Sequence, residues 1–145
     1  MAQWIRQAAA IPIYDGQVCL VTSSSGRRWV IPKGMIEPGH TAGETSLRET
    51  WEEAGLVGVL HQEPVGSYLY EKNGCLFHVI VFVMQVTEEA EDWPERLSRQ
   101  RVWLSSEDVL ERIQEPGLRE ILETVFQMPP SAGRSIIPIE TGTTT

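Results

Sequence analysis

Residues 34–56 read GMIEPGHTAGETSLRETWEEAGL, and this stretch predicts a loop rich in glycine and proline that leads into a helix. Thr41 and Glu44 have the Thr-x-x-Glu spacing of a capping box, which fixes where the helix begins. Gly55 is a typical left-handed helix stop. The sequence therefore predicts a helix over residues 42–54.

The last two turns of this predicted helix carry three acidic residues, Glu49, Glu52 and Glu53. They lie at the negative end of the helix dipole and repel one another at i, i+3 and i+4 spacing, at a cost of roughly 0.2–1 kcal/mol for each clash. Arg48 is the only base in the helix and does not neutralise the group. We interpret the cluster as the binding site of a cation; the alternative is a solvated glutamate face, which usually mixes charges of both signs.

The same stretch resembles the Nudix box of the Nudix hydrolases. Gly34 occupies its first position, and residues 48–56 supply the Arg-Glu-x-x-Glu-Glu-x-Gly-Leu pattern. His40 stands where the box usually has Glu, and Thr50 stands where it usually has an aliphatic residue. The resemblance implies an α/β (α+β) protein with the Nudix fold, an α/β/α sandwich with a mixed β-sheet and the Nudix loop-helix. It also implies cleavage of nucleoside diphosphates linked to another moiety, and of related pyrophosphates, with divalent cations.

The acidic residues suit Mg²⁺, with Mn²⁺ as a possible substitute, because hard cations take carboxylate, water and phosphate oxygens as ligands. Glu49 and Glu53 lie one turn apart on one helix face, so both are expected to bind the metal. Glu52 is offset from them and is the candidate to hold or deprotonate the attacking water, a choice that follows the resemblance. Arg48 is the second candidate catalytic residue and is expected to orient a neighbouring glutamate.

A second resemblance extends beyond the box. Residues 23–34 and 91–108 are similar to the corresponding parts of the diphosphoinositol polyphosphate phosphohydrolases, which also cleave diadenosine polyphosphates. By this likeness nine residues become candidates for substrate binding: Arg6, Ser24, Arg27, Arg28, Lys33, Gly34, Lys72, Arg99 and Arg101. Lys33 and Arg101 are favoured because a motif flanks each one. For Arg27 and Lys72, a solvated surface position is the preferred alternative.

Composition limits the partners of the protein. The chain has 145 residues and a net charge of −8, which argues against non-specific binding to nucleic acid or to an anionic membrane. A site for a polyanionic small molecule must therefore combine a few local bases with metal. Cys19 and Cys75 lie in apolar runs and are predicted to be reduced core residues, without a disulfide or a zinc site. No stretch has the pattern of a leader or a membrane span, so we expect a cytoplasmic protein.

Residues 1–128 are expected to form a single domain, and residues 129–145 a loosely attached tail rich in Pro, Gly, Ser and Thr. Trp29, Trp93 and Trp103 are interpreted as core or rim residues. Strands are expected over residues 4–14 and 17–23 around an Asp-Gly turn, over 28–31, 57–70 and 102–104, and over 75–86 as a central strand covered on both faces; helices are expected from Ser105 or Ser106 to 113 and from Pro116 to about 127.

The favoured function is a metal-dependent pyrophosphohydrolase acting on a polyphosphate-containing metabolite. Within that class, an ADP-ribose or nucleoside triphosphate pyrophosphatase remains an alternative to an enzyme for dinucleoside polyphosphates or diphosphoinositol polyphosphates. A non-catalytic nucleotide-binding module on the same fold is the other alternative, and His40 is its support in the sequence. The oligomeric state is left open.

Overall fold

The computed structural model describes residues 4–127. The predicted tail over residues 129–145 lies outside the described residues. In chain order the elements are β1 (Trp4–Tyr14), β2 (Gln17–Thr22), β3 (Trp29–Val30), β4 (Lys33–Met35), α1 (Ala42–Ala54), β5 (Leu56–Leu60), β6 (Gly66–Lys72), β7 (Cys75–Glu89), β8 (Arg101–Leu104), α2 (Ser106–Arg112) and α3 (Pro116–Gln127). Among the described helices, none combines the length and apolar character that a membrane crossing requires.

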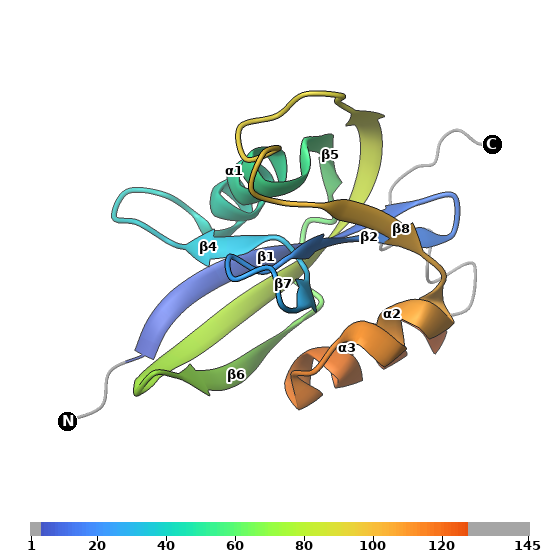
Figure 1. The fold of residues 1–145 in the computed structure, drawn as a ribbon. Helices are drawn as coiled ribbons and strands as arrows, with labels where there is room; N and C mark the ends of the chain where they lie inside the picture. The colour runs from blue at the N-terminus through green and yellow to red at the C-terminus, as the bar shows by residue number, and fades with distance from the viewer. Residues whose placement is uncertain (1–3, 128–145) are drawn as a thin grey trace.

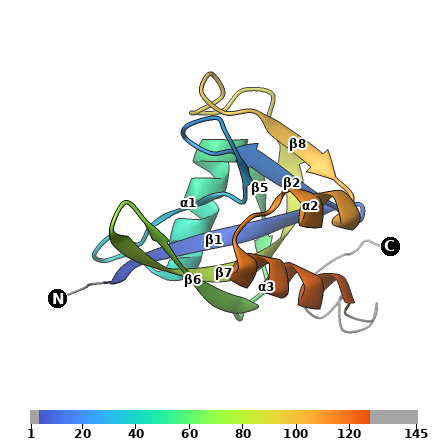
Figure 2. The ribbon, with the colours of Figure 1, turned by 60° about the horizontal axis from the view of Figure 1, so that its bottom comes forward.

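Eight strands form one mixed sheet within the described residues, and its principal order is β3-β2-β1-β7-β5. β1 and β7 run parallel along ten paired positions at the centre of the sheet, whereas the other pairs are antiparallel. α1 covers one face of the sheet, and α2 and α3 lie against the other face (Figures 1 and 2). The predicted α/β/α sandwich with a mixed sheet is confirmed.

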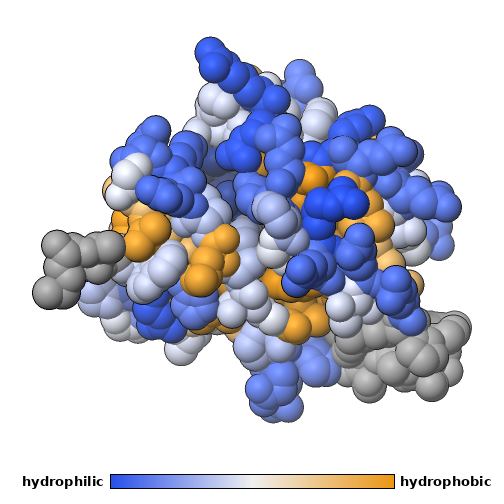
Figure 3. All heavy atoms as spheres, turned by 90° about the horizontal axis from the view of Figure 1, so that it is seen from below, coloured by the Kyte–Doolittle hydropathy of each residue, from blue (hydrophilic) through white to orange (hydrophobic). Residues whose placement is uncertain are grey.

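The core consists of one apolar cluster on each face of this sheet. Val79, Val81 and Val83 of β7 point into the cluster that contains the buried residues of α2 and α3. Met84, on the opposite face of β7, packs in the cluster that contains Ala54 of α1. The alternating pattern of residues 75–86 therefore predicted the two-sided burial of this strand correctly. Figure 3 shows the molecule from below, where hydrophobic residues occur in separate groups between hydrophilic ones.

Three expectations about the elements differ from the structure. The extended stretch 57–70 is divided into β5 and β6 by residues 61–65, which include Pro64, and proline has no N–H for a sheet ladder. β4 was expected to be part of a loop. Cys75 is exposed at the start of β7, so its prediction as a core residue was wrong; Cys19 is buried as predicted.

The site depends on how β1 divides one of its edges between two partners. β2 pairs with the end of β1, where Ile13 lies opposite Val18. β4 pairs with an earlier part of β1, where Ala8 lies opposite Gly34. Because β7 occupies the other edge of β1, β2 and β4 pair with different parts of the same edge. Residues 23–32 connect these two strands. The sheet is therefore open between β2 and β4, beside the end of α1 and the loop after β2.

Candidate active site

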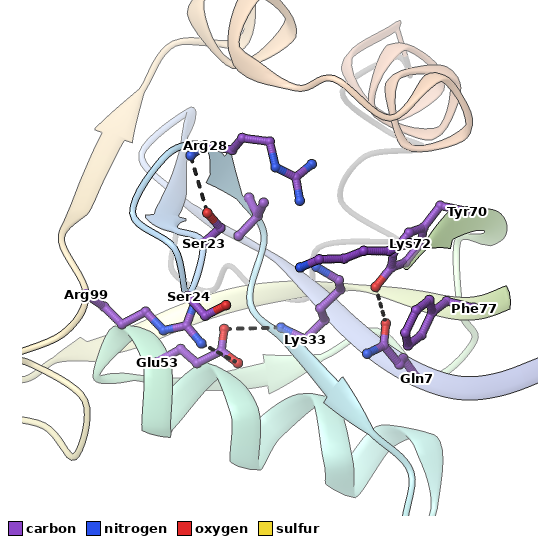
Figure 4. Close-up of a pocket in the computed structure, with 11 residues that line it drawn as sticks. Gln7, Ser23, Ser24, Arg28, Lys33, Glu53, Tyr70, Lys72, Phe77 and Arg99 are labelled. Atoms are coloured by element: carbon purple, nitrogen blue, oxygen red, sulfur yellow. Dashed lines mark hydrogen bonds and ion pairs between the residues drawn. The ribbon is translucent and has the colours of Figure 1, made fainter. Parts of the chain in front are cut away.

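A cavity of about 200 Å³ lies where β2 and β4 separate (Figure 4). The loop after β2, the strands β1, β4, β6 and β7, the end of α1 and the segment before β8 all contribute to its wall. The lining residues are Gln7, Ser23, Ser24, Arg28, Val30, Lys33, Glu53, Tyr70, Lys72, Phe77 and Arg99.

Four of the lining residues are bases, namely Arg28, Lys33, Lys72 and Arg99, and one is an acid, Glu53. Figure 4 shows the side chains of Arg28, Lys33 and Lys72 converging on a common space. In a chain with a net charge of −8, this cavity is a local concentration of positive charge. Such a cluster attracts polyanions despite the acidic surface around it.

Two of these bases are held in place by surrounding groups. Arg28 Nη1 donates to Glu115 Oε2 at 2.8 Å, which fixes the guanidinium beside the start of α3. Lys33 Nζ lies 5.6 Å from the centre of the Tyr70 ring. Burial lowers the pKa of Lys33, while the charges of Glu115 and Glu53 oppose the shift. A bound anion would stabilise the charged form of this amine.

The acidic helix has the predicted ends. Thr41 and Glu44 exchange both hydrogen bonds of the capping box, and Gly55 has a left-handed backbone with φ of 68°. This geometry directs Glu53 inward, where only 4% of the residue is exposed. Glu53 Oε1 accepts a hydrogen bond from the Lys33 backbone N–H at 3.4 Å.

Burial raises the pKa of Glu53 from 4.5 to about 8. The charge of Arg99 opposes this shift, whereas a side-chain hydrogen bond with Glu49 and the charge of Glu49 add to it. The carboxyl groups of Glu49 and Glu53 both lie against the start of β4, because Glu53 bonds the Lys33 N–H and Glu49 lies against Gly34. Two such groups are costly to ionise together unless a cation joins them.

Gly34 makes room for this acidic pair. A β-carbon at Gly34 would clash with the carboxyl group of Glu49. Glycine at this position therefore lets the Glu49 carboxyl lie directly against the backbone of β4. Gly34 is outside the cavity lining, and its predicted role in substrate binding stays a prediction.

The donor atoms of this pair fit a hard divalent cation. Glu49 and Glu53 offer carboxylate oxygens, which Mg²⁺ and Mn²⁺ prefer, and Mg²⁺ is commonly held by one or two carboxylates with water and phosphate oxygens. In the part of the chain that the structure describes, no three His, Cys, Asp or Glu side chains form a more complete metal cluster. The fit therefore depends on substrate or water completing the coordination.

Glu52 and Arg48 lie beside the pair on the more exposed side of α1. Arg48 Nη2 is 3.3 Å from Glu49 Oε2, and Arg48 Nε is 3.9 Å from Glu52 Oε2. Arg48 thus lies between Glu49 and Glu52 and contacts both. Partial burial and the charge of Glu49 raise the pKa of Glu52.

Of the nine predicted substrate-binding residues, five line the cavity: Ser24, Arg28, Lys33, Lys72 and Arg99. Arg6 and Arg27 are exposed and outside the lining. Arg101, which the sequence favoured as a phosphate contact, is also outside the lining. Its guanidinium donates to the carbonyl oxygens of Ala54 at 2.7 Å and Ala90 at 2.6 Å.

The sequence analysis did not identify the polar and aromatic part of the cavity wall, which consists of Gln7, Tyr70 and Phe77. The rings of Tyr70 and Phe77 are stacked, with centroids 4.7 Å apart, and Tyr70 Oη donates to Gln7 Oε1 at 2.9 Å. The sequence indicates a turn between the expected strands at Lys72-Asn73-Gly74. Asn73 and Gly74 have positive φ, and the resulting hairpin places Tyr70 directly opposite Phe77.

Comparisons with known proteins agree with this geometry. A family model described as NUDIX domain matches residues 4–125. Diphosphoinositol polyphosphate phosphohydrolase 3-beta of Homo sapiens is 36% identical over 133 residues, covering 86% of this chain and 78% of that protein. Nudix hydrolase 12, mitochondrial, of Arabidopsis thaliana is 35% identical over 122 residues, covering 77% of this chain. Because that relative is named mitochondrial, the expected cytoplasmic location stays a prediction.

The chain spans only part of some relatives, namely 59% of Nudix hydrolase 12 and 55% of Nudix hydrolase 4 of Arabidopsis thaliana. Among solved structures, a NUDIX hydrolase from Nitrosomonas europaea superposes with a TM-score of 0.74 at 20% identity, covering 90% of this chain and 95% of that one. A C. elegans Ap4A hydrolase gives 0.68 at 20% identity, with 83% and 95% covered, and at this identity the likeness shows the fold. The match to the family model over nearly all described residues shows that the chain belongs to the NUDIX family.

Proposed function

We propose that the protein is a Mg²⁺-dependent pyrophosphohydrolase that cleaves a phosphoanhydride bond in a polyphosphate-containing metabolite. One observation carries the proposal. Glu53 belongs to the acidic pair with Glu49 and at the same time lines the cavity of four bases. A site that joins carboxylates for a cation to bases for an anion suits phosphate chemistry, which depends mainly on positioning and electrostatics.

The residues divide into three roles. Glu49 and Glu53 would hold the ion, whose chemistry is to neutralise phosphate charge and polarise the bond that breaks. The four bases of the cavity would bind the phosphate chain, and Arg28 suits this because a guanidinium can grip a phosphate through two hydrogen bonds. Arg99, which pairs with Glu53 and Glu95, would contribute mainly its charge. Glu52 would accept a proton from water, since its pKa is raised and its side chain reaches solvent.

The charge of the cavity also bears on the length of the substrate. Four bases exceed what a short diphosphate needs when a cation is present as well. They favour a chain of several phosphates, such as a diadenosine polyphosphate or a diphosphoinositol polyphosphate. The names of a human relative and of a C. elegans structural neighbour, a diphosphoinositol polyphosphate phosphohydrolase and an Ap4A hydrolase, support the same direction.

The alternative of a non-catalytic binding module gains no support from the site. It rested on His40, whose side chain is 47% exposed beside the capping box, 3.9 Å from Glu44. His40 is outside the cavity lining, and the acids of α1 and the bases of the cavity are all present.

A panel of substrates tests the proposal. Diadenosine tetraphosphate, a diphosphoinositol polyphosphate, ADP-ribose and ATP would be supplied at equal concentration with Mg²⁺, and products would be identified by mass spectrometry. We expect turnover of the first two above that of ADP-ribose and ATP. Binding of these compounds without any turnover would favour the non-catalytic module, and a clear preference for ADP-ribose would contradict the argument from charge.

A further inference from the structure

The C-terminal end of α1 is held by the segment between β7 and β8, which lies beside it in Figure 1. The last turn of α1 contains no basic residue, although it carries acids at the negative end of the helix dipole. The final carbonyl groups of a helix also have no partners within the helix. A positive charge at this end and hydrogen-bond donors for these carbonyl groups must therefore come from outside α1.

Four successive carbonyl groups at this helix end accept hydrogen bonds from residues 90–101. The carbonyl oxygen of Glu52 accepts from the Glu95 N–H at 3.0 Å, and that of Gly55 accepts from the Ala90 N–H at 2.9 Å. Between them, the Glu53 oxygen accepts from Trp93 Nε1–H at 3.0 Å. The oxygen of residue 54 accepts from Arg101, as described above. The fit is close, since a β-carbon at Gly55 would lie 2.9 Å from the Trp93 side chain.

Arg101 is the centre of this arrangement. Its guanidinium carbon lies 4.0 Å from the centre of the Trp93 ring, and its Nε lies 3.1 Å from Glu89 Oε2. Together with its bonds to the carbonyls of Ala54 and Ala90, these contacts engage all three nitrogens and one face of the guanidinium. The side chain is only 16% exposed and lies outside the cavity lining, so it is not available to a substrate.

We propose that Arg101 and Trp93 are positioning residues for Glu52 and Glu53. They fix the carbonyls of residues 53 and 54 and place a positive charge at the acidic helix end, which sets the direction of both carboxylates. The catalytic part of this inference rests on the proposed function. Groups that orient the ligands of a metal without touching it commonly change metal affinity or activity when they are replaced.

Two conservative variants test the inference. Trp93→Phe keeps an aromatic ring for Arg101 but removes the N–H that the Glu53 carbonyl accepts. Arg101→Lys keeps the charge but removes the planar fork that bonds two carbonyls at once. Trp4→Phe and Arg96→Lys are matched controls, because Trp4 is exposed and Arg96 forms an exposed ion pair with Asp92 in the same segment.

The first measurement is Mn²⁺ affinity of the substrate-free protein, followed by electron paramagnetic resonance. We expect a loss of about tenfold or more in both test variants and no change in the controls. With an active substrate from the panel, kcat should fall similarly, while KM should stay within about twofold because neither residue lines the cavity. Arg28→Lys should show the reverse pattern, in which KM rises and Mn²⁺ affinity does not change.

Unchanged Mn²⁺ affinity and kcat in folded Trp93→Phe would overturn the inference, as would a higher KM at constant kcat in Arg101→Lys. Melting temperatures establish that each variant is folded, and Trp93→Phe decides alone if Arg101→Lys does not fold. A parent protein that binds Mn²⁺ but hydrolyses nothing would contradict the proposed function only. The Mn²⁺ affinities of the variants would still decide the positioning of the glutamates.

Discussion

Arg99 Nη2 lies 3.6 Å from Glu53 Oε2, and this ion pair connects the acidic end of α1 with the base-lined cavity. Arg99 also contacts Glu95 Oε1 at 2.8 Å and donates to the carbonyl of Thr22 at 2.7 Å. The pair brings residues 46 positions apart in the chain into one site.

Lys72→Gln should lower kcat/KM more for diadenosine tetraphosphate than for ADP-ribose. Lys72 is exposed on β6 and lines the cavity, so its replacement should remove a phosphate contact without disturbing the core. A hydrogen bond to a charged group contributes about 1.5–3 kcal/mol, which corresponds to a loss of about tenfold or more for the longer substrate. Steady-state kinetics with both substrates measure the difference.

Arg27→Gln is the matched control for this prediction, because Arg27 is exposed but outside the cavity lining. It should leave both substrates nearly unaffected. Equal losses on the two substrates in Lys72→Gln would contradict the argument that the bases select for the length of the phosphate chain.

Metal-free protein should lose stability as pH rises from 5 to 9, in part because of Glu53. Its pKa is about 8 in the folded protein against 4.5 for an ordinary glutamate, so folding favours the protonated form. This contribution is complete below pH 4.5 and is lost as pH passes 8. Glu53→Gln, whose amide stays neutral, should therefore gain in melting temperature relative to the parent at higher pH.

Thermal melts in EDTA at pH 5, 7 and 9 measure this gain. A rise of a few degrees is expected, because about 1 kcal/mol moves the melting temperature by roughly 2–8 °C in domains near this size. Added Mg²⁺ should stabilise the parent at pH 9 more than the variant. A difference between the two proteins that does not change with pH would show that Glu53 is already ionised in the metal-free fold.

The features that were predicted correctly depend on residues close together in the chain. The capping box, Gly55 and the Asp15-Gly16 turn each act within a few residues, so the sequence displays them directly. The alternation along β7 is likewise a local pattern, and it predicted burial on both faces of that strand. These signals located the elements, whereas the fold class was implied by the resemblance to the Nudix box.

Contacts between distant segments could not be predicted from the sequence. β4 has three residues and forms because it pairs with β1, more than twenty positions earlier, so its own sequence carries little strand signal. Arg101 follows a motif that suggested a phosphate contact, yet its partner Ala54 is 47 positions away at the end of α1. A sequence pattern can single out such a base, but the fold determines which groups it contacts.

His40→Glu should change kcat/KM by less than about tenfold, or roughly 1.4 kcal/mol in the barrier. The imidazole is half exposed and outside the cavity, and the nearby Glu44 already accepts the Thr41 N–H at 3.0 Å. The new carboxylate would therefore meet solvent and a like charge but no group of the site. If the replacement switched on activity in an inert parent, the protein would instead be a degenerate binding module.

The most direct test of the account is product release from the best substrate of the panel in Mg²⁺, in excess EDTA and after Mg²⁺ is restored. Parent, Glu53→Gln and Glu111→Gln are compared, and Glu111 is an exposed control on α2. We predict that EDTA stops the parent reversibly and that Glu53→Gln loses about a hundredfold or more in kcat while remaining folded. The control should behave like the parent. Full turnover in EDTA, or an unaffected Glu53→Gln, would contradict the account.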